Sequence, residues 1–434
     1  MKILFIHQNY PGQFKHLAPA LAAQPGNRVV VLTIRDVPPQ PGIQIVRYRV
    51  ARSSSPNIHP WAVSTETKII RGEAAFHAAL RLRKGGFMPD VIFAHPGWGE
   101  SLFLKDVWPD ARLLIYCEFF YRPEGADFNF DPEFRRNDLG EHCRIRVNNA
   151  NHLLHMDACD WAISPTHWQR ATHPPSFQPR ISVIHDGIDT GHVRPDPEVA
   201  VEIAGRRFTR ADEVVTFVNR NLEPYRGYHI FMRALPEILA RRPNAHVVIV
   251  GSEGHSYGAK PAGDLSYKQR FLNEVRGRID PSRVHFTGSV DYDLFLRLMQ
   301  LSSVHVYLTY PFVLSWSMIE AMVAGACVVA SRTAPVVEAI EDGRTGLLVD
   351  FFDKAALAEA VVGALADPGR RAALGAAARD FAIARYDLRR VCLPRQLDLL
   401  ENLAAGREPP APPLPPVDYR DFLARVAELR DAAA

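Results

Sequence analysis

The sequence contains few cysteines, and they follow no metal-binding or disulfide pattern. The five cysteines lie at positions 117, 143, 159, 327 and 392, an odd number at wide spacings with no Cys-x-x-Cys pair. This distribution argues against a disulfide framework and a zinc ribbon, and it fits a reducing compartment. His152 and His155 could share a helix face near Asp157 and Asp160, but no further ligand follows at a familiar spacing. We therefore predict no metal site.

Long apolar runs and a strong excess of charge are also missing. The first apolar run ends at His7, too early for a signal peptide, and no later segment approaches the roughly 18 apolar residues that span a bilayer. Lys and Arg total 51 against 48 Asp and Glu, a formal net charge of +3, whereas nucleic-acid binders usually concentrate more positive charge. We expect a cytoplasmic protein without a nucleic-acid partner.

What is present is typical of a soluble enzyme with two α/β domains. The chain has 434 residues, of which 47% are hydrophobic and 23% charged. Short apolar strands alternate with helices, a rhythm that predicts parallel sheets covered on both faces. In the first half we expect strands over 2–6, 28–33, 91–94, 113–116, 161–164 and 181–184, with a helix over 14–23 and a long loop over 121–138. In the second half we expect strands over 214–218, 246–250, 284–286, 304–308 and 327–330, with a helix over 228–241.

Four segments follow from this pattern. Residues 1–195 and 205–375 form two Rossmann-like domains, separated by a charged stretch that contains prolines. Residues 376–405 form helices broken near Pro394, and 406–434 form a Pro-rich linker with a terminal amphipathic helix. That helix either caps the domain surface or docks on a partner or membrane. Its apolar positions are Tyr419, Phe422, Leu423, Val426 and Leu429.

Polar residues that follow strands of the second domain form a candidate anion site. Ligands of open parallel sheets bind at the carboxyl ends of the strands. Arg220 and Arg226 follow one strand, and their guanidinium groups suit a diphosphate, although a solvated basic loop is the alternative. A helix that starts near Ser315 to Ser317 would add free N–H groups and a favourable dipole. Glu320, in its first turns, either reaches a ribose diol or acts as a structural carboxylate.

Three segments resemble family 4 glycosyltransferases, which have the GT-B fold. They are SWSMIEAMVAGACVVAS over 315–331, PVVEAIEDGRTGLLV over 335–349 and VIHDGIDTGHVRP over 183–195. The resemblance covers nearly the whole chain to about residue 403. It implies two doubly wound Rossmann-like α/β domains facing a central cleft, with the acceptor on the N-terminal domain and the nucleotide-sugar on the C-terminal one.

The resemblance also implies a reaction and a site. The expected reaction is metal-independent, retaining transfer from a nucleotide-sugar, with UDP favoured over GDP, to a hydroxyl of a glycan, lipid-linked or protein acceptor. No cofactor is expected, since the nucleotide-sugar is a substrate and UDP or GDP the product. The expected catalytic residues are Arg220, Arg226, Glu118 and His95. The expected donor-binding residues are Gly12, Gly251, Glu253, Gly288, Phe312, Leu314, Ser315, Trp316, Ser317 and Glu320.

Two positions depart from the family pattern. Phe312 stands where relatives have the first Glu of a Glu-x7-Glu motif, a carboxylate that grips sugar hydroxyls. Glu118 stands roughly where relatives often have a His. Glu118 either polarises an acceptor hydroxyl, contacts the donor sugar or pairs with a base such as Arg122. Phe312 either forms an apolar wall of the sugar site or points into the core.

Other readings remain open at this point. A UDP-sugar 2-epimerase would share the architecture, whereas a nicotinamide dehydrogenase lacks support because no G-x-G-x-x-G follows the first strand. A periplasmic sugar-binding protein would need a signal peptide. The basic helix from Lys68 to Lys84 either contacts anionic lipid at the membrane periphery or is a solvated helix face. The sequence does not determine the oligomeric state.

Overall fold

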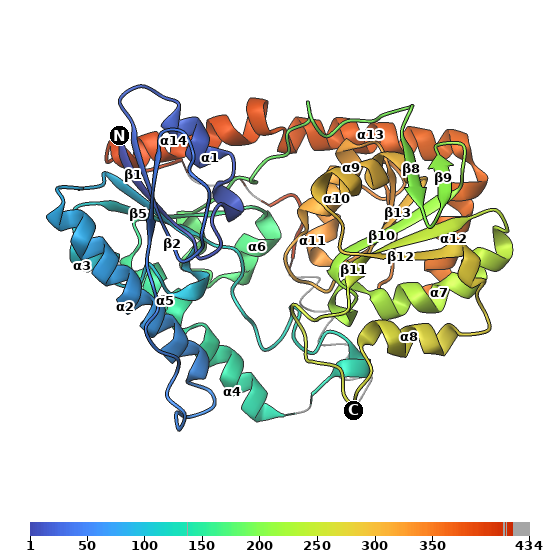
Figure 1. Cartoon of the computed structure of the whole chain (residues 1–434), viewed down its shortest axis with the longest axis horizontal. Coiled ribbons are helices and arrows are strands. Elements are labelled where there is room, and N and C mark those ends of the chain that lie inside the picture. The colour runs from blue at the N-terminus through green and yellow to red at the C-terminus, as the bar shows by residue number, and fades with distance from the viewer. Residues whose placement is uncertain (137, 411–412, 414, 420–434) are drawn as a thin grey trace. The chain divides into compact units, whose positions relative to one another are not determined.

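A computed structural model describes residues 1–136, 138–410, 413 and 415–419 (Figure 1). The chain divides into two compact units, which we call unit 1 and unit 2. Unit 1 contains residues 1–187 together with the chain from 389 onward, and unit 2 contains residues 188–388. Unit 2 is therefore an insertion between two parts of unit 1.

Unit 1 is built on a parallel sheet of seven strands in the order β3-β2-β1-β4-β5-β6-β7. The strands are β1 Lys2–Ile6, β2 Arg28–Thr33, β3 Ile43–Arg47, β4 Val91–Ala94, β5 Arg112–Tyr116, β6 Trp161–Ser164 and β7 Ile181–Val183. The chain adds strands to one side of β1 up to β3 and then continues on the other side with β4. The strand order thus reverses between β1 and β4, the position where open parallel sheets bind ligands.

Helices cover both faces of this sheet because its strands carry apolar side chains on both sides. The helices are α1 Leu17–Ala22, α2 Val63–Lys84, α3 Leu104–Val107, α4 Leu139–Asn148, α5 Ala150–Ala158, α6 His167–Thr172 and α14 Leu393–Ala404. One face packs on α2 and α3, and the other on α1 and α14. Leu399, Leu400 and Leu403 bring α14 into the second core.

Unit 2 repeats the topology with a parallel sheet of six strands in the order β12-β11-β10-β13-β14-β15. Its strands are β10 Val214–Asn221, β11 His246–Ser252, β12 Val284–Gly288, β13 Val304–Tyr307, β14 Cys327–Ser331 and β15 Leu347–Val349. A two-stranded antiparallel hairpin, β8 Ala200–Ile203 with β9 Arg206–Thr209, precedes them. The order reverses between β10 and β13, so this gap corresponds to the one between β1 and β4.

The helices of unit 2 are α7 Tyr228–Arg241, α8 Tyr267–Val275, α9 Tyr292–Leu301, α10 Trp316–Val323, α11 Ala334–Val337, α12 Lys354–Ala366 and α13 Pro368–Tyr386. Helices α9, α10 and α13 share one hydrophobic core with the strands and the hairpin. A π-helical turn over Leu388–Cys392 connects α13 to α14 of unit 1.

These boundaries differ from the sequence-based ones in three places. Residues 188–195 belong to unit 2, because Ile188 pairs with the chain at Asp387. The predicted 376–405 segment is split, since α13 belongs to unit 2 and α14 to unit 1. The predicted helix over 14–23 is shorter, because the turn Gly12–Phe14 is 3-10 helical and α1 begins only at Leu17.

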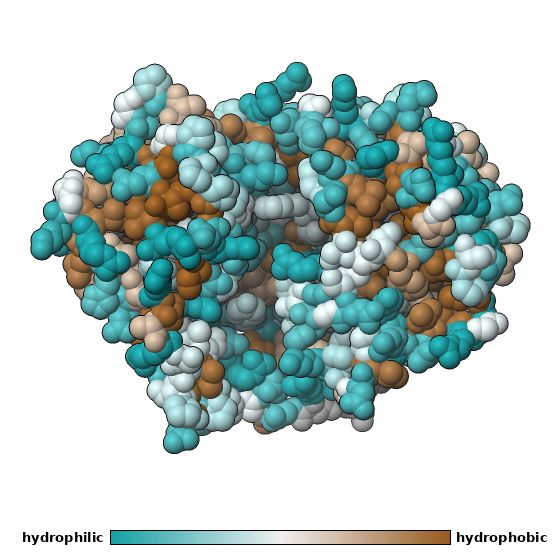
Figure 2. Space-filling model, viewed as in Figure 1, coloured by the Kyte–Doolittle hydropathy of each residue, from teal (hydrophilic) through white to brown (hydrophobic). Residues whose placement is uncertain are grey.

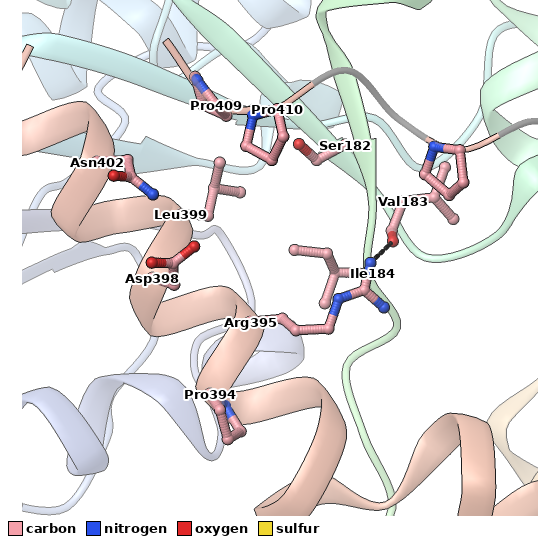
Figure 3. A pocket seen from close by; sticks show the side chains of 11 residues that line it. Ser182, Val183, Ile184, Pro394, Arg395, Asp398, Leu399, Asn402, Pro409 and Pro410 are labelled. Carbon is pink, nitrogen blue, oxygen red and sulfur yellow. Dashed lines mark hydrogen bonds between the residues drawn. The ribbon is translucent and has the colours of Figure 1, made fainter. Parts of the chain in front are cut away.

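The C-terminal segment runs along unit 1 as far as it is described. Pro409, Pro410 and Pro413 enclose a cavity of about 360 Å³ with β7 and α14 (Figure 3). Tyr419 is buried, with its ring centroid 5.5 Å from that of Trp168. The remainder of the predicted terminal helix, residues 420–434, lies outside the described residues.

The surface shows hydrophilic side chains interspersed with apolar patches on the visible face (Figure 2). In the described part of the chain, no helix has both the length and the apolar character that crossing a membrane requires. All five cysteines are free thiols, and only Cys143 among them is exposed.

Candidate active site

Arg226 is the central cation of unit 2. It lies in a 3-10 turn, Pro224–Arg226, directly after β10, and its side chain is buried. Its Nη1 is 2.7 Å from Thr309 Oγ1, 3.1 Å from Tyr307 Oη and 3.1 Å from the Val313 carbonyl oxygen. These three partners follow or end β13, so Arg226 bridges the gap where the strand order reverses.

The hydrogen-bond partners of Arg226 are neutral, although the Glu223 carboxylate also interacts electrostatically with its guanidinium. Within the described residues, no carboxylate lies at ion-pair distance from this buried guanidinium. A buried cation is costly unless an anion neutralises it. The arrangement is therefore suited to an anionic ligand.

A buried carboxylate shapes the loop that covers Arg226. Glu223 accepts hydrogen bonds from the backbone N–H groups of Ser256 and Tyr257, at 3.1 to 3.3 Å. Burial raises the pKa of Glu223, and these N–H groups counteract that rise. The Tyr257 ring consequently lies 5.4 Å from the Arg226 guanidinium, a cation–π distance. The sequence analysis did not identify Glu223 or Tyr257.

Arg220 differs from Arg226 in its surroundings. It lies near the end of β10, is exposed, and makes no hydrogen bond or ion pair with any other described residue. The structure thus separates the two predicted arginines into one fixed, buried cation and one solvated cation. Both belong to the carboxyl-terminal end of the same strand.

Helix α10 begins beside the Arg226 cluster, as the sequence predicts. Ser315 is its N-cap, and the Ser315 hydroxyl accepts a hydrogen bond from the Ser317 N–H. The Ser315 N–H donates to Tyr307 Oη over 2.9 Å, and Tyr307 Oη also contacts Arg226. The positive end of the α10 dipole and the guanidinium therefore share one hydroxyl, an arrangement that favours a negative charge nearby. Leu314 is buried in the core, and Trp316 is exposed.

Phe312 belongs to an aromatic cluster. It is 8% exposed, and its ring centroid lies 5.8 Å from that of Tyr225 and 5.0 Å from that of Tyr257, with the rings close to edge-on. Tyr257 in turn covers Arg226. Phe312 therefore packs behind the residue that shields the cation, which favours the core-facing alternative of the sequence analysis.

The remaining predicted donor-binding residues of unit 2 either bond to neighbouring side chains or are glycines at or near the ends of strands. Glu253 accepts hydrogen bonds from Ser266 and Lys268, both over 2.9 Å, and these lower its pKa. Tyr292 donates a hydrogen bond to Glu320 over 2.7 Å. A Cβ at Gly251 would come within 2.9 Å of the Asn219 carbonyl oxygen, so β11 approaches the loop after β10 closely. Gly288 ends β12 in a left-handed conformation with open space around it.

In unit 1, His95 and Glu118 meet at the carboxyl ends of β4 and β5. The buried His95 Nε2 lies 3.3 Å from Glu118 Oε2, an ion-pair distance whose angles fall short of a hydrogen bond. The His95 ring stacks on Tyr116, with centroids 5.5 Å apart. The Glu118 side chain is 42% exposed, so a substrate can reach it. The structure therefore brings these two separately predicted residues together.

The loop after β1 contributes two residues that the sequence analysis missed, His7 and Gln13. His7 is buried, and its ring centroid lies 5.1 Å from that of His95. Gln13 Nε2 lies 3.4 Å from Glu118 Oε1. Gly12 adopts φ +45°, and a Cβ there would come within 2.4 Å of His7 Nε2. His7 directly follows β1, which is the signal used in unit 2, whereas Gln13 lies further along the loop, in the 3-10 turn Gly12–Phe14.

The suspected histidine pair is occupied by protein contacts. His155 Nε2 lies 2.6 Å from Ser101 Oγ, and its Nδ1 lies 2.7 Å from the Asn151 carbonyl oxygen. Over the ranges that the structure describes, no group of three His, Cys, Asp or Glu side chains is arranged to hold a metal ion.

Two family models match the chain. The "Glycosyl transferase family 4 group" matches residues 25–193, and the "Glycosyl transferases group 1" matches residues 202–381. One similar protein is the GDP-mannose-dependent alpha-(1-6)-phosphatidylinositol monomannoside mannosyltransferase of Mycolicibacterium smegmatis, 28% identical over 56% of this chain and 61% of its own. The phosphatidyl-myo-inositol mannosyltransferase of the same organism is 32% identical over 42% and 43%. The D-inositol 3-phosphate glycosyltransferase of Corynebacterium efficiens is 24% identical over 69% and 68%.

The chain thus aligns with less than two thirds of the length of the first two relatives. Among solved structures, sucrose-phosphate synthase of Thermosynechococcus elongatus superposes with a TM-score of 0.68 at 19% identity, over 93% of this chain and all of its own. Anabaena HepE in complex with UDP gives 0.63 at 17% identity, with the same coverage. These structures confirm the predicted two-domain α/β fold of the GT-B type. The two family models confirm the resemblance of the sequence motifs, and the chain belongs to the family 4, group 1 glycosyltransferases.

Proposed function

We propose that the protein transfers a sugar from a nucleoside diphosphate donor to an acceptor hydroxyl. One observation carries this proposal: Arg226 is buried among neutral partners at the gap between β10 and β13, beside the start of α10. A diphosphate would add negative charge beside this buried cation. The relatives named above carry glycosyltransferase names, which supports transfer over the alternative 2-epimerase reaction.

The chemistry follows from where charge develops. When the bond between the anomeric carbon and the diphosphate breaks, negative charge grows on the leaving phosphate. Arg226, the exposed Arg220 and the N-terminal end of α10 would stabilise that charge as preorganised donors. In the retaining reaction that we propose, the acceptor hydroxyl attacks from the face that the phosphate leaves. The arginines take the place of a divalent cation, so we expect excess EDTA to leave activity intact.

For the donor, we propose GDP-mannose as the first candidate. The first relative named above uses GDP-mannose by its name, which weighs against the UDP preference of the sequence analysis. Phe312 stands where relatives have the carboxylate that grips sugar hydroxyls, so the donor-sugar hydroxyls need another partner, and we propose Ser315, a predicted donor residue beside the Arg226 cluster. UDP-sugars are the second candidate donors, and the nucleotide panel described below tests both.

For the acceptor, we propose an inositol-containing molecule, because inositol occurs in the names of all three relatives. A cationic surface on unit 1 supports a phosphorylated or membrane-bound acceptor as the finer expectation. A hollow of about 520 Å³ between β3 and α2 is lined by Arg47, Arg49, Arg52, Arg81 and one acidic residue, Glu73. Binding to phosphatidylglycerol vesicles, weakened by Arg49→Gln with Arg81→Gln but not by Arg276→Gln with Arg278→Gln, would support peripheral membrane contact.

A thermal-shift panel tests the donor site. The panel contains GDP, UDP, ADP and TDP with their sugars, and a ligand at 100 times its Kd should stabilise the protein by about 2.7 kcal/mol. We expect GDP or UDP to give the largest shift, and Arg226→Ala to abolish it. If no nucleotide stabilises the wild-type protein, or if Arg226→Ala keeps the full shift, the diphosphate assignment is wrong.

A further inference from the structure

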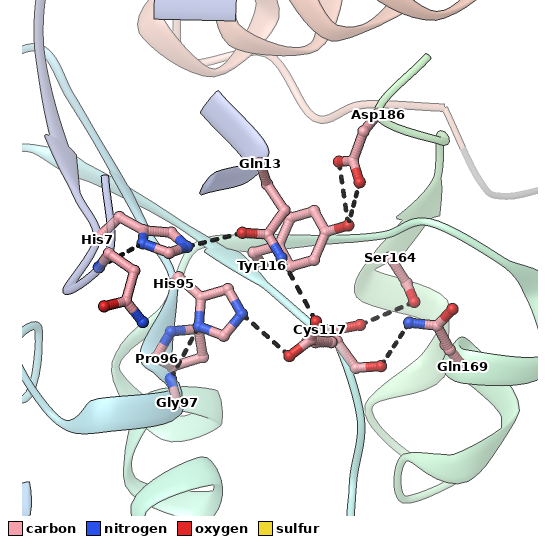
Figure 4. Close-up of polar contacts among 12 residues, drawn as sticks. His7, Gln13, His95, Pro96, Gly97, Tyr116, Cys117, Ser164, Gln169 and Asp186 are labelled. Atoms are coloured by element: carbon pink, nitrogen blue, oxygen red, sulfur yellow. Dashed lines mark hydrogen bonds and ion pairs between the residues drawn. The ribbon is translucent and has the colours of Figure 1, made fainter. Parts of the chain in front are cut away.

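The unit 1 site contains two histidines whose ring tautomers are determined by the backbone. The Asn9 N–H donates to His7 Nδ1 over 2.9 Å, and the Gly97 N–H donates to His95 Nδ1 over 3.2 Å. In each case the donor lies two residues after the histidine. A neutral ring that accepts at Nδ1 carries its proton on Nε2. Both rings therefore point an Nε2–H group into the site (Figure 4).

Both Nε2–H groups lead to the Glu118 carboxylate, and each leads to a different oxygen. His7 Nε2 lies 2.7 Å from Gln13 Oε1, which orients the amide so that Gln13 Nε2 donates toward Glu118 Oε1 over 3.4 Å. His95 Nε2 approaches Glu118 Oε2 directly at 3.3 Å. The two paths start from β1 and β4, the strands that flank the reversal of strand order, and converge on the loop after β5.

Neighbouring residues hold His7, Gln13 and Glu118 in these positions. The Glu118 carbonyl oxygen accepts a hydrogen bond from Gln169 Nε2 over 2.7 Å, which ties the backbone of the loop to α6. Burial lowers the pKa of His7 to about 3, with a further contribution from His95. His7 therefore stays neutral at physiological pH. Gly12 has no side chain, which leaves room for the His7 ring.

Gln13 donates to the Glu118 carboxylate over 3.4 Å, and His95 Nε2 lies 3.3 Å from it, while the side chain remains partly exposed. Both contacts are long. Long contacts of this kind commonly shorten when a substrate binds. A carboxylate in this position accepts hydrogen bonds from hydroxyl groups and repels anions. The site thus suits the neutral, hydroxylated edge of a polyol.

We infer that Glu118 binds an acceptor hydroxyl, and that His7 and Gln13, together with His95, are positioning residues that orient its carboxylate. This inference rests on the proposed glycosyl transfer. It adds a role for two residues of the loop after β1, and it assigns Glu118 to the acceptor and not to the donor sugar. The phosphate of a phosphorylated acceptor would have to lie away from Glu118.

Steady-state kinetics test the inference with myo-inositol as the acceptor and the donor that the nucleotide panel selects. Glu118→Gln should raise the acceptor KM by ~10- to 100-fold, the range for hydrogen bonds to a charged group. Gln13→Ala and His7→Phe should each raise it by about 10-fold. His7→Gln retains an N–H donor near the Nε2 position and should restore most of the loss. The donor KM should change less than twofold in every variant, because the inference assigns Glu118 to the acceptor.

His305→Phe is the matched control, because His305 is a buried histidine of unit 2 that lies outside the site. It should lower stability without changing the acceptor KM. Equal changes in the acceptor KM for His305→Phe and His7→Phe would reduce His7 to a structural role. An unchanged acceptor KM in Gln13→Ala and His7→Phe would overturn the inference.

A second readout is independent of catalysis. Long-range ¹H–¹⁵N NMR spectra of the imidazole rings should show His7 and His95 as Nε2–H tautomers, with His7 unchanged between pH 8 and 5. Gln13→Ala should shift the His7 Nε2 resonance and leave its Nδ1 resonance in place. If the wild-type protein transfers no sugar, the proposed function fails while this spectrum still decides the hydrogen-bond arrangement. An Nδ1–H tautomer at either ring would disprove it.

Discussion

The two units use the same topology to hold opposite charges. In unit 1, the strands that flank the reversal of strand order lead to His7 and His95, and the acidic residue Glu118 lies beside His95 in the loop after β5. In unit 2, the equivalent strands lead to Arg226 and to hydroxyl partners such as Thr309. In the sites that we propose, strand order would determine where a ligand binds, and the loop residues would determine whether a hydroxyl group or a phosphate is bound.

The buried histidines make the units differ in acid stability. In unit 1, burial lowers the pKa of His7 to about 3 and the pKa values of His155, His173 and His185 to about 4. Among the described residues of unit 2, only His305 has a pKa lowered to about 4. A histidine with a lowered native pKa stabilises the fold above the unfolded value of about 6.5, and this stability is lost as the pH falls below that value. Each such group should cost about 2 kcal/mol at pH 5.

We therefore expect unit 1 to lose more stability than unit 2 between pH 7 and 5. Tryptophan fluorescence reports mainly on unit 1, because Trp316 is the only one of the six tryptophans in unit 2. Denaturant titrations followed by fluorescence, and hydrogen exchange of unit 2 peptides corrected for intrinsic rates, separate the two units. His7→Phe should reduce the pH dependence of the fluorescence transition. Equal losses in both units would refute the difference in acid stability.

Removal of the buried cation should have the next largest effect. Arg226→Ala should lower kcat/KM by ~10² to 10³, the range for losing one donor to developing charge. Arg226→Lys should retain part of the activity, because the charge remains but the planar fork is lost. Circular dichroism spectra identify variants that have not folded. A folded Arg226→Ala variant with near-normal kcat/KM would show that Arg226 is not the cation that stabilises the leaving phosphate.

The backbone turn that carries Arg226 offers a sharper test of position. Gly227 has φ +68°, and a Cβ there would lie 2.3 Å from Leu308 Cβ. Gly277 has φ +78° with nothing within 4 Å of the added atom. Gly277→Ala should cost roughly 1–2 kcal/mol from backbone strain alone. Gly227→Ala should lower the free energy of unfolding by more than this and should also weaken nucleotide binding. Thermal denaturation with and without nucleotide measures both effects. Equal effects of Gly227→Ala and Gly277→Ala would argue against the clash with Leu308.

The smallest effect is expected at Glu253, a predicted donor residue that contacts Ser266 and Lys268. It is exposed, so Glu253→Gln should change stability by at most about 0.2–1 kcal/mol. Nucleotide affinity should stay within twofold if its role is local. A larger loss of affinity, measured by isothermal titration, would return Glu253 to the donor site.

The sequence predicted the central strands of the two sheets better than the strands at the sheet edges. Apolar strands such as Val91–Ala94 and Trp161–Ser164, and helix Tyr228–Arg241, were predicted at their observed limits because their apolar pattern ends sharply. Strand β3, the hairpin β8–β9 and strand β15 were missed. Strand β3 and the hairpin carry charged residues, and β15 has only three residues, so the hydrophobic pattern gives a weak signal for each of them.

The site was predicted where one residue follows one strand and was missed where residues cooperate across loops. Arg226 and Ser315 could be located from their positions after strands. That Phe312 packs against Tyr225 and Tyr257 depends on contacts between three separate loops. The contact between Gln13 and Glu118 joins residues 105 positions apart, and no local pattern encodes it.

The return of the chain to unit 1 through α14 has a consequence for synthesis. Leu399, Leu400 and Leu403 complete one of the two cores of unit 1, and they follow the whole of unit 2 in the chain. On the ribosome, unit 2 can therefore form all of its own contacts before unit 1 receives its last helix. Until α14 emerges, the face of the first sheet that it covers is open to water and to chaperones. The order of assembly is thus the reverse of the order in which the two units begin.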